Sequence, residues 1–226
     1  MTTNLKLSVL VATVATIVVA VLLVATRPSG PSGQVAEPAP SAPVPAEVLV
    51  RPDSHKLSTA PDGAVTVVEF LDLECEACRA AFPVVEQLRQ EYAGRVTFVM
   101  RYFPIPSHRN SDLAARSVEA AGQQGKLEEM YRKMYETQAQ WGDQQVDHRA
   151  TFVGFARELG LDVATFEAAL DAPTTAERVQ ADFREGINIG VEGTPTFFVN
   201  GRHLSAMPTY ETLRAAIERE LATSPR

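Results

Sequence analysis

The sequence predicts an α/β fold in which a mixed β-sheet is flanked by helices and a helical subdomain is inserted before the last strands. Three observations support this fold class. Apolar, β-branched runs of strand length occur in both halves of the chain. A helical stretch separates them, from about residue 111 to residue 188. The roughly 180 residues that follow the N-terminal region suit one domain with a sizeable core.

The expected elements follow in chain order. Strands are predicted at about 54–57, 65–71 and 96–102, with a helix over 75–92 between the second and the third. Five helical segments come next, at 112–122, 126–138, 149–160, 163–171 and 176–190. Strands at 196–200 and 202–205 and a helix at 209–222 complete the chain.

Local signals mark several ends of these elements. Asp162 and Thr174 are predicted to cap helix N-termini, and Gly160 is predicted to end a helix. Asn200-Gly201 is the signal of a tight hairpin between the last two strands.

Residues 1–26 are predicted to form an N-terminal transmembrane anchor. The run from Leu5 to Thr26 contains one charged residue, Lys6, and is rich in Val, Leu and Ala. As a helix it would be about 33 Å long, enough to cross a bilayer. The apolar part of a cleaved signal peptide is shorter, about 7–15 residues, and no convincing cleavage site follows here. An uncleaved anchor is therefore favoured over a cleaved signal, and we expect a single-pass protein of the cell membrane with its main body on the extracytoplasmic side.

Residues 27–48 are expected to be a linker, and residues 49–226 the folded domain. The linker contains six prolines among Ser, Gly and Ala residues. Such a composition cannot bury a core and favours an extended, partly polyproline II chain. We interpret the linker as a passive spacer.

Cys75 and Cys78 are the two cysteines of the chain, and they follow a predicted strand and open a predicted helix. A helix N-terminus carries unpaired N–H groups and a partial positive charge, which stabilise a thiolate. The thiolate is the form of cysteine that attacks disulfides. This arrangement therefore predicts redox chemistry at the pair.

Two other interpretations of the cysteine pair are weaker. A zinc site needs about four ligands, usually from a second cysteine pair or from closely spaced histidines, and the four histidines here are scattered singly. No metal site and no cofactor are therefore expected. A purely structural disulfide between Cys75 and Cys78 would close a very small loop and constrain little of the unfolded chain.

Glu69 and Pro195 are candidate partners of the cysteines. Alternation along the strand places Glu69 on the same face of the sheet as Leu71, where a carboxylate is costly unless it is paired or protonated. Its pKa should be raised, and it is a candidate proton acceptor for Cys78; the alternative is a strand-end Glu that reaches solvent. Pro195 heads a strand, where a cis Thr194–Pro195 bond is expected.

The combination of these motifs resembles a known family. The matching residues are Glu69-Phe70, the Cys75-x-x-Cys78 motif, Pro83, Arg101-Tyr102-Phe103-Pro104 and the segment from Gly193 to Gly201. Together, over about residues 48–222, they resemble thioredoxin-fold proteins of the DsbA type, the bacterial extracytoplasmic thiol–disulfide oxidoreductases. The long separation between the cysteines and the Thr-Pro motif matches the helical insertion of that type.

The resemblance implies a mechanism. Cys75 would be the nucleophile that forms a mixed disulfide with a substrate, Cys78 would resolve it, and Glu69 would carry the proton of Cys78. Pro195 would lie against the cysteine pair, and Thr194 would offer backbone groups to an extended substrate segment. His108 stands at a position that is often His in relatives; a surface histidine at a helix start is the alternative.

The residues around Cys75 depart from those of relatives. The dipeptide between the cysteines is Glu76-Ala77, without the proline and the histidine found in many relatives. Glu74 and Glu76 flank Cys75 and should disfavour its negative charge, while the helix dipole opposes them. We therefore expect a weaker oxidant than relatives with a histidine in the dipeptide.

The predicted function is disulfide formation in exported, cysteine-containing proteins, with a membrane redox partner that resets the pair. A disulfide reductase or isomerase kept reduced by a membrane partner is one alternative, and a non-catalytic holdase or metal-handling module is another. The formal net charge of −7, with no basic cluster, argues against nucleic acid as a partner. A monomer is expected.

Overall fold

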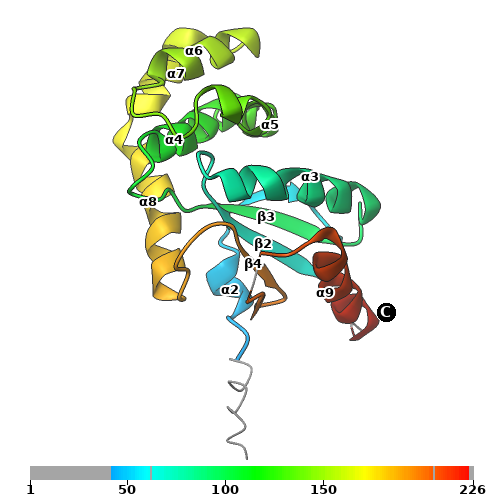
Figure 1. Cartoon of the computed structure of the whole chain (residues 1–226). Helices are drawn as coiled ribbons and strands as arrows, with labels where there is room; N and C mark the ends of the chain where they lie inside the picture. Colours follow the sequence, from blue (N-terminus) through cyan, green and yellow to red (C-terminus); the bar gives the residue numbers. More distant parts are fainter. Residues whose placement is uncertain (1–41, 62, 206, 224–226) are drawn as a thin grey trace, which may run out of the picture. The chain divides into compact units, whose positions relative to one another are not determined.

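A five-stranded mixed sheet organises the chain (Figure 1). The computed structural model describes residues 42–61, 63–205 and 207–223. The strands, in the order in which they lie side by side, are β1 (His55–Ser58), β3 (Thr97–Tyr102), β2 (Thr66–Leu71), β4 (Thr196–Val199) and β5 (Arg202–His203). β2 and β3 are parallel, and the other neighbouring pairs are antiparallel. The mixed sheet predicted from the sequence is therefore confirmed.

The expected anchor, residues 1–26, and most of the linker lie outside the described residues. The last part of the linker differs from the prediction, because Ala46–Leu49 form a short helix, α2, where an extended chain was expected. Leu49 is buried, and the Val44 N–H donates to the Gly201 carbonyl at 2.9 Å, so these residues are part of the folded domain. Within the described ranges, no helix combines the length and the apolar composition needed to span a bilayer.

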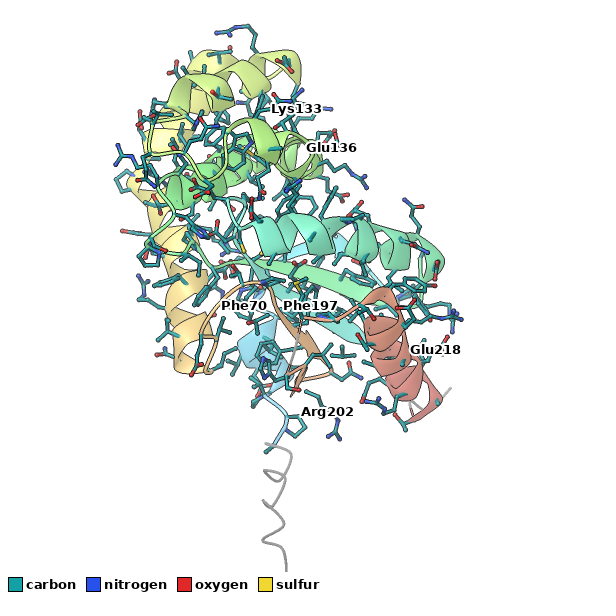
Figure 2. All side chains as sticks on the ribbon, in the orientation of Figure 1. Phe70, Lys133, Glu136, Phe197, Arg202 and Glu218 are labelled. Atoms are coloured by element: carbon teal, nitrogen blue, oxygen red, sulfur yellow. The ribbon has the colours of Figure 1, made fainter. Side chains whose placement is uncertain are left out.

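Alternation along the strands divides the core between the two faces of the sheet. On one face Val67, Leu71 and Met100 pack with α3 (Glu76–Glu91) and α9 (Tyr210–Thr223). On the other face Val68 and Phe70 pack with α2 and with α8. Figure 2 shows Phe70 and Phe197 at the sheet, while the charged side chains of Glu136 and Glu218 lie on the outer sides of helices.

The inserted subdomain lies between β3 and β4 in the chain. Its elements are α4 (Ser111–Gly122), α5 (Leu127–Thr137), the 3-10 turn η1 (Gln138–Gln140), α6 (Arg149–Glu158), α7 (Val163–Asp171) and α8 (Pro173–Asn188). α4 to α7 form one group, and α8 runs from that group along the side of the sheet (Figure 1). These helices agree with the predicted segments to within a few residues.

Most of the predicted end signals are confirmed. Asp162 caps α7, and its side chain accepts from the Thr165 N–H at 2.7 Å. Gly160 follows α6 with a φ of +74°, and Asn200 and Gly201 have the positive φ values of a hairpin turn. The prediction for Thr174 is wrong, because α8 starts at Pro173, whose fixed φ suits the first helical position, and Ala172 takes the cap position.

A buried charge cluster joins α8 to the sheet and to α2. The Arg101 side chain on β3 and the Asp182 side chain on α8 are both fully buried and form an ion pair. Asp182 also pairs with Arg51 at 2.9 Å and with Arg178 at 2.7 Å. Arg101 donates to the Leu49 carbonyl at 2.7 Å. Since one carboxylate serves three guanidinium groups, the packing of this face of the sheet depends on Asp182.

Replacing Asp182 with Asn should lower the free energy of unfolding by about 3–5 kcal/mol, because Arg101, Arg51 and Arg178 lose the fully buried carboxylate that they share. Urea denaturation followed by circular dichroism measures this loss. Asp171→Asn is the matched control, since Asp171 is 62 % exposed and pairs with Arg149 at the surface, where loss of a pair costs less than about 1 kcal/mol. Equal losses in the two variants would contradict the role assigned to Asp182.

Candidate active site

The two cysteines occupy the N-terminus of α3, directly behind β2. Cys75 is the N-cap residue, and Cys78 lies in the first turn. Cys75 is 9 % exposed and Cys78 is 0 % exposed, so only Cys75 is open to a substrate. Both are free cysteines in this structure.

The surroundings of the two thiols shift their pKa values in opposite directions. A hydrogen bond from the Cys78 thiol, together with hydrogen bonding by Thr194 and by the backbone of Cys78 and Ala77, lowers the pKa of Cys75 to about 5 against the opposing effect of burial. Burial, the hydrogen bond to Cys75 and the charge of Glu69 raise the pKa of Cys78 well above its usual value. At neutral pH the reduced pair is therefore a Cys75 thiolate beside a Cys78 thiol.

Glu69 is buried in β2 on the face that carries the cysteines. Its side chain shares this face with Val67 and Leu71, and the residue is 4 % exposed, so the alternative of a solvent-reaching Glu is wrong. Its neighbours in register are Met100 on β3 and Phe197 on β4, neither of which can neutralise it. Burial first, and then the charges of Glu86 and Cys75, raise the pKa of Glu69 to about 8. The expected rise in pKa is confirmed.

The Thr194–Pro195 peptide bond is cis, as expected. The Thr194 carbonyl lies 3.4 Å from the Cys75 sulfur, so the loop before β4 touches the exposed thiol. An open cavity of about 300 Å³ lies beside this loop, lined by Gly193, Thr194, Pro195, Leu204 and Met207 among others. The structure thus brings the Thr194–Pro195 loop to Cys75, and it places a hollow beside that loop.

The two acids that flank Cys75 have different surroundings. Glu74 is buried, and its carboxylate accepts from the Asn110 N–H at 2.6 Å. Glu76 is exposed on the first turn of α3. Neither carboxylate is among the main causes that set the pKa of Cys75, which hydrogen bonds lower to about 5. A weaker oxidant than relatives with a histidine between the cysteines stays a prediction.

Sequence reasoning missed Asp72, which organises the loop between β2 and α3. Its carboxylate accepts from the Glu74 N–H at 2.8 Å and from the Ile105 N–H at 2.9 Å, and it lies 2.6 Å from His108 Nδ1. Its own N–H donates to the Cys78 sulfur at 3.5 Å. The sequence shows only that Asp72 is an acidic residue directly after a strand. Its partners Ile105 and His108 are more than 30 residues away in the chain, so the contacts could not be predicted.

Gln138 was also missed, and it ties the inserted subdomain to the same loop. Its side-chain amide donates to the Leu73 carbonyl at 2.7 Å and to the Cys75 carbonyl at 3.0 Å. Its amide oxygen accepts from Arg79 at 3.0 Å. In the part of the chain that the structure describes, no three His, Cys, Asp or Glu side chains are grouped so as to hold a metal ion.

Known proteins resemble this chain in sequence and in fold. A family model described as Thioredoxin (Thioredoxin_4) matches residues 59–219. A thioredoxin-like oxidoreductase from Silicibacter pomeroyi DSS-3 superposes with a TM-score of 0.69 at 28 % identity, covering 80 % of this chain and 100 % of that one. BdbD from Bacillus subtilis in its oxidised form superposes with a TM-score of 0.65 at 24 % identity, covering 75 % and 93 %. The fold of α-DsbA1 from Wolbachia pipientis is also similar, with a TM-score of 0.69 at 17 % identity, covering 77 % and 94 %.

Curated relatives match the same region within much longer chains. The Na⁺/H⁺ antiporter NhaA of Herminiimonas arsenicoxydans is 33 % identical over 180 residues, which are 78 % of this chain and 27 % of that protein. NhaA 1 of Salinispora arenicola is 34 % identical over 171 residues, 75 % and 25 % of the two chains. This chain thus spans about a quarter of the length of the curated relatives it matches.

The family model covers β2 to α9, including both cysteines, the cis proline and the helical insertion. The sheet order and the similar solved structures agree with this family. The solved structures include thiol–disulfide exchange proteins of the DsbA type. The chain therefore belongs to the thioredoxin family that this model describes, with a DsbA-like fold.

Proposed function

We propose that this protein is a thiol–disulfide oxidoreductase that forms disulfides in exported proteins through Cys75 and Cys78. The observation that carries the proposal is the asymmetry of the pair: an accessible thiolate and a buried thiol at one helix N-terminus. The Thr194 carbonyl lies against the accessible sulfur, and Thr194 and Pro195 also line the neighbouring cavity, so they would hold an extended substrate segment there.

The reaction starts from the oxidised Cys75–Cys78 disulfide. A substrate thiolate attacks the Cys75 sulfur, so a mixed disulfide forms and the Cys75–Cys78 bond breaks. Cys78 leaves as a thiolate, and Glu69 supplies its proton. A second substrate thiolate then attacks the substrate sulfur of the mixed disulfide, forming the substrate disulfide and releasing the Cys75 thiolate. Two electrons pass from the substrate to the pair, and a membrane redox partner must remove them.

The acidity of Cys75 supports this direction of electron flow. A disulfide is a strong oxidant when its reduced thiolate is stabilised, and the pKa of Cys75 is about 5. This favours an oxidase over the reductase and isomerase alternatives, in spite of the acidic residues around Cys75. No contact within the described residues favours a holdase or a metal-handling module.

The proposal includes a place of action. Residues 5–26 would anchor the monomeric protein in the cell membrane, with the catalytic domain on the extracytoplasmic side, where disulfides are stable. The apolar composition of that run supports an anchor. The presence of a similar region in proteins named as Na⁺/H⁺ antiporters is compatible with work at a membrane.

The thiolate assignment predicts how reactivity depends on pH. Alkylation of the reduced protein by iodoacetamide should rise with a midpoint near pH 5, and Cys75→Ser should abolish the reaction. Cys78→Ala should shift the midpoint upward, because it removes the hydrogen bond that contributes most to the low pKa of Cys75. The same variant should accumulate a mixed disulfide with a cysteine-containing protein. A wild-type midpoint near pH 9 would contradict the assignment.

Glu69→Gln should slow thiol–disulfide exchange on the order of ten- to a hundred-fold, because Cys78 loses its proton donor and acceptor. Stopped-flow mixing of the oxidised protein with a dithiol peptide measures the rate. A stability difference accompanies it: because the pKa of Glu69 is raised to about 8, the stability that the protonated carboxyl provides is lost as pH rises from about 4.5 through 8. The free energy of unfolding of the variant minus that of the wild type should therefore grow over this range, reaching on the order of 5 kcal/mol at pH 9, while the titration of Cys75 is common to both proteins.

Glu167→Gln is the control for both measurements, because Glu167 is exposed on α7. Normal exchange rates in Glu69→Gln would remove Glu69 from the mechanism.

The redox state in cells tests the direction of electron flow. Thiol trapping of the full-length protein should find Cys75 and Cys78 mainly as the disulfide, since an oxidase is held ready by its partner. A pair found mainly as the dithiol would overturn the oxidase proposal and indicate a reductase or an isomerase.

A further inference from the structure

A histidine–carboxylate pair lies beside the cysteines and takes no part in the reaction described above. His108 stands in the loop between β3 and α4, and its Nδ1 lies 2.6 Å from the Asp72 carboxylate. The His108 side chain is 33 % exposed, whereas that of Asp72 is fully buried. A buried carboxylate needs a charged partner or several hydrogen bonds, and Asp72 has both.

Asp72 connects His108 to both cysteines. Its N–H donates to the Cys78 sulfur at 3.5 Å, and its carbonyl accepts from the Cys75 N–H at 3.2 Å. The imidazole is thus held on the side chain of the residue whose backbone contacts the reactive pair. The Glu74 and Ile105 N–H groups fix the carboxylate from two separate loops, so the ring cannot move away without breaking a buried cluster.

The charged and titratable groups around His108 come from the elements packed against it. Asp72, Glu74 and Cys75 belong to the loop before α3, and Tyr135 of α5 donates to the Asp72 carbonyl at 3.3 Å. The hydrogen bond to Asp72, and then the charges of Asp72, Cys75 and Glu74, raise the pKa of His108 against the effect of burial. The three negative groups therefore favour the protonated ring.

The cysteine motif itself provides no positive side chain, because the two residues between the cysteines are Glu76 and Ala77. We propose that His108, paired with the buried Asp72 carboxylate, adds a positive charge that stabilises the Cys75 thiolate beyond the hydrogen bonds to its sulfur. His108 is then a positioning residue for the exchange reaction, and this inference rests on the proposed function.

The test is a titration of the thiolate absorbance near 240 nm in the reduced full-length protein. His108→Asn keeps a hydrogen-bond donor near Asp72 but removes the charge, so the midpoint for Cys75 should rise by about one pH unit. The equilibrium constant with glutathione should shift about tenfold toward the disulfide form of the protein, which becomes a weaker oxidant. The double variant Asp72→Asn with His108→Asn removes both charges, so its titration midpoint for Cys75 should return toward the wild-type value.

His55→Asn is the matched control. His55 on β1 forms a similar pair with Glu119 of α4, at 2.5 Å, and neither residue contacts the cysteine loop. This variant should leave the Cys75 midpoint unchanged. His108→Gln repeats the test if the Asn variant does not fold.

A measurement on the wild type needs no variant. Because coupling between two titrating groups is reciprocal, the His108 pKa followed by NMR should be lower in the oxidised protein, which has no Cys75 thiolate. An unchanged Cys75 midpoint in folded His108 variants, or equal His108 pKa values in the two redox forms, would overturn the inference. Failure of the proposed function would look different, as a wild-type protein that does not exchange with glutathione although its thiolate titrates normally.

Discussion

The interaction of the Cys78 thiol with the Cys75 sulfur is the constraint on which the site depends, because it is the largest cause of the low pKa of Cys75. The Cys78 thiol donates and the Cys75 sulfur accepts, and the reverse is unfavourable. The reason is that Cys78 is enclosed by the core, whereas Cys75 is partly exposed at the helix N-terminus. The fold enforces that difference. β2 delivers both Glu69 and the cysteine loop to one face of the sheet, and α3 turns its first N–H groups toward the outer sulfur. A negative charge on Cys78 would therefore be disfavoured, because it would lie in the same buried region that raises the pKa of the Glu69 carboxyl to about 8.

The inserted subdomain contributes to this arrangement directly. Gln138 in η1 holds the Cys75 carbonyl, Tyr135 holds the Asp72 carbonyl, and the Asn110 N–H holds the Glu74 carboxylate. Each contact reaches the cysteine loop from a different part of the helical group. α8 then returns the chain to the sheet, where Asp182 binds Arg101. The insertion thus fixes the cysteine loop through several contacts, and one of these holds the Glu74 carboxylate on the Asn110 N–H.

Most of the framework could be predicted because its signals are local. The strand before the cysteines, the cap at Asp162 and the hairpin at Asn200 each follow from a few adjacent residues. The burial of Glu69 followed from alternation with period two. The prediction for Thr174 was wrong because two local preferences compete there. The preference of proline for the first helical position outweighs that of threonine for the cap, so α8 begins at Pro173. The roles of Asp72 and Gln138 could not be predicted, since their partners are up to 65 residues away in sequence and one sequence carries no record of that proximity.

The charges of Glu69 and Cys75 also explain when a proton is available. In the reduced pair the Cys75 thiolate helps to keep Glu69 protonated, because its charge raises the pKa of that carboxyl. In a mixed disulfide the Cys75 sulfur is uncharged, so this contribution disappears and Glu69 becomes the stronger acid. That is the stage at which the Cys78 thiolate is released and needs a proton. When the Cys75 thiolate is released at the end of the cycle, the pKa of Glu69 rises again and the carboxyl takes up a proton. In the proposed mechanism, the covalent state of the Cys75 sulfur therefore contributes to the timing of proton donation from Glu69 to Cys78.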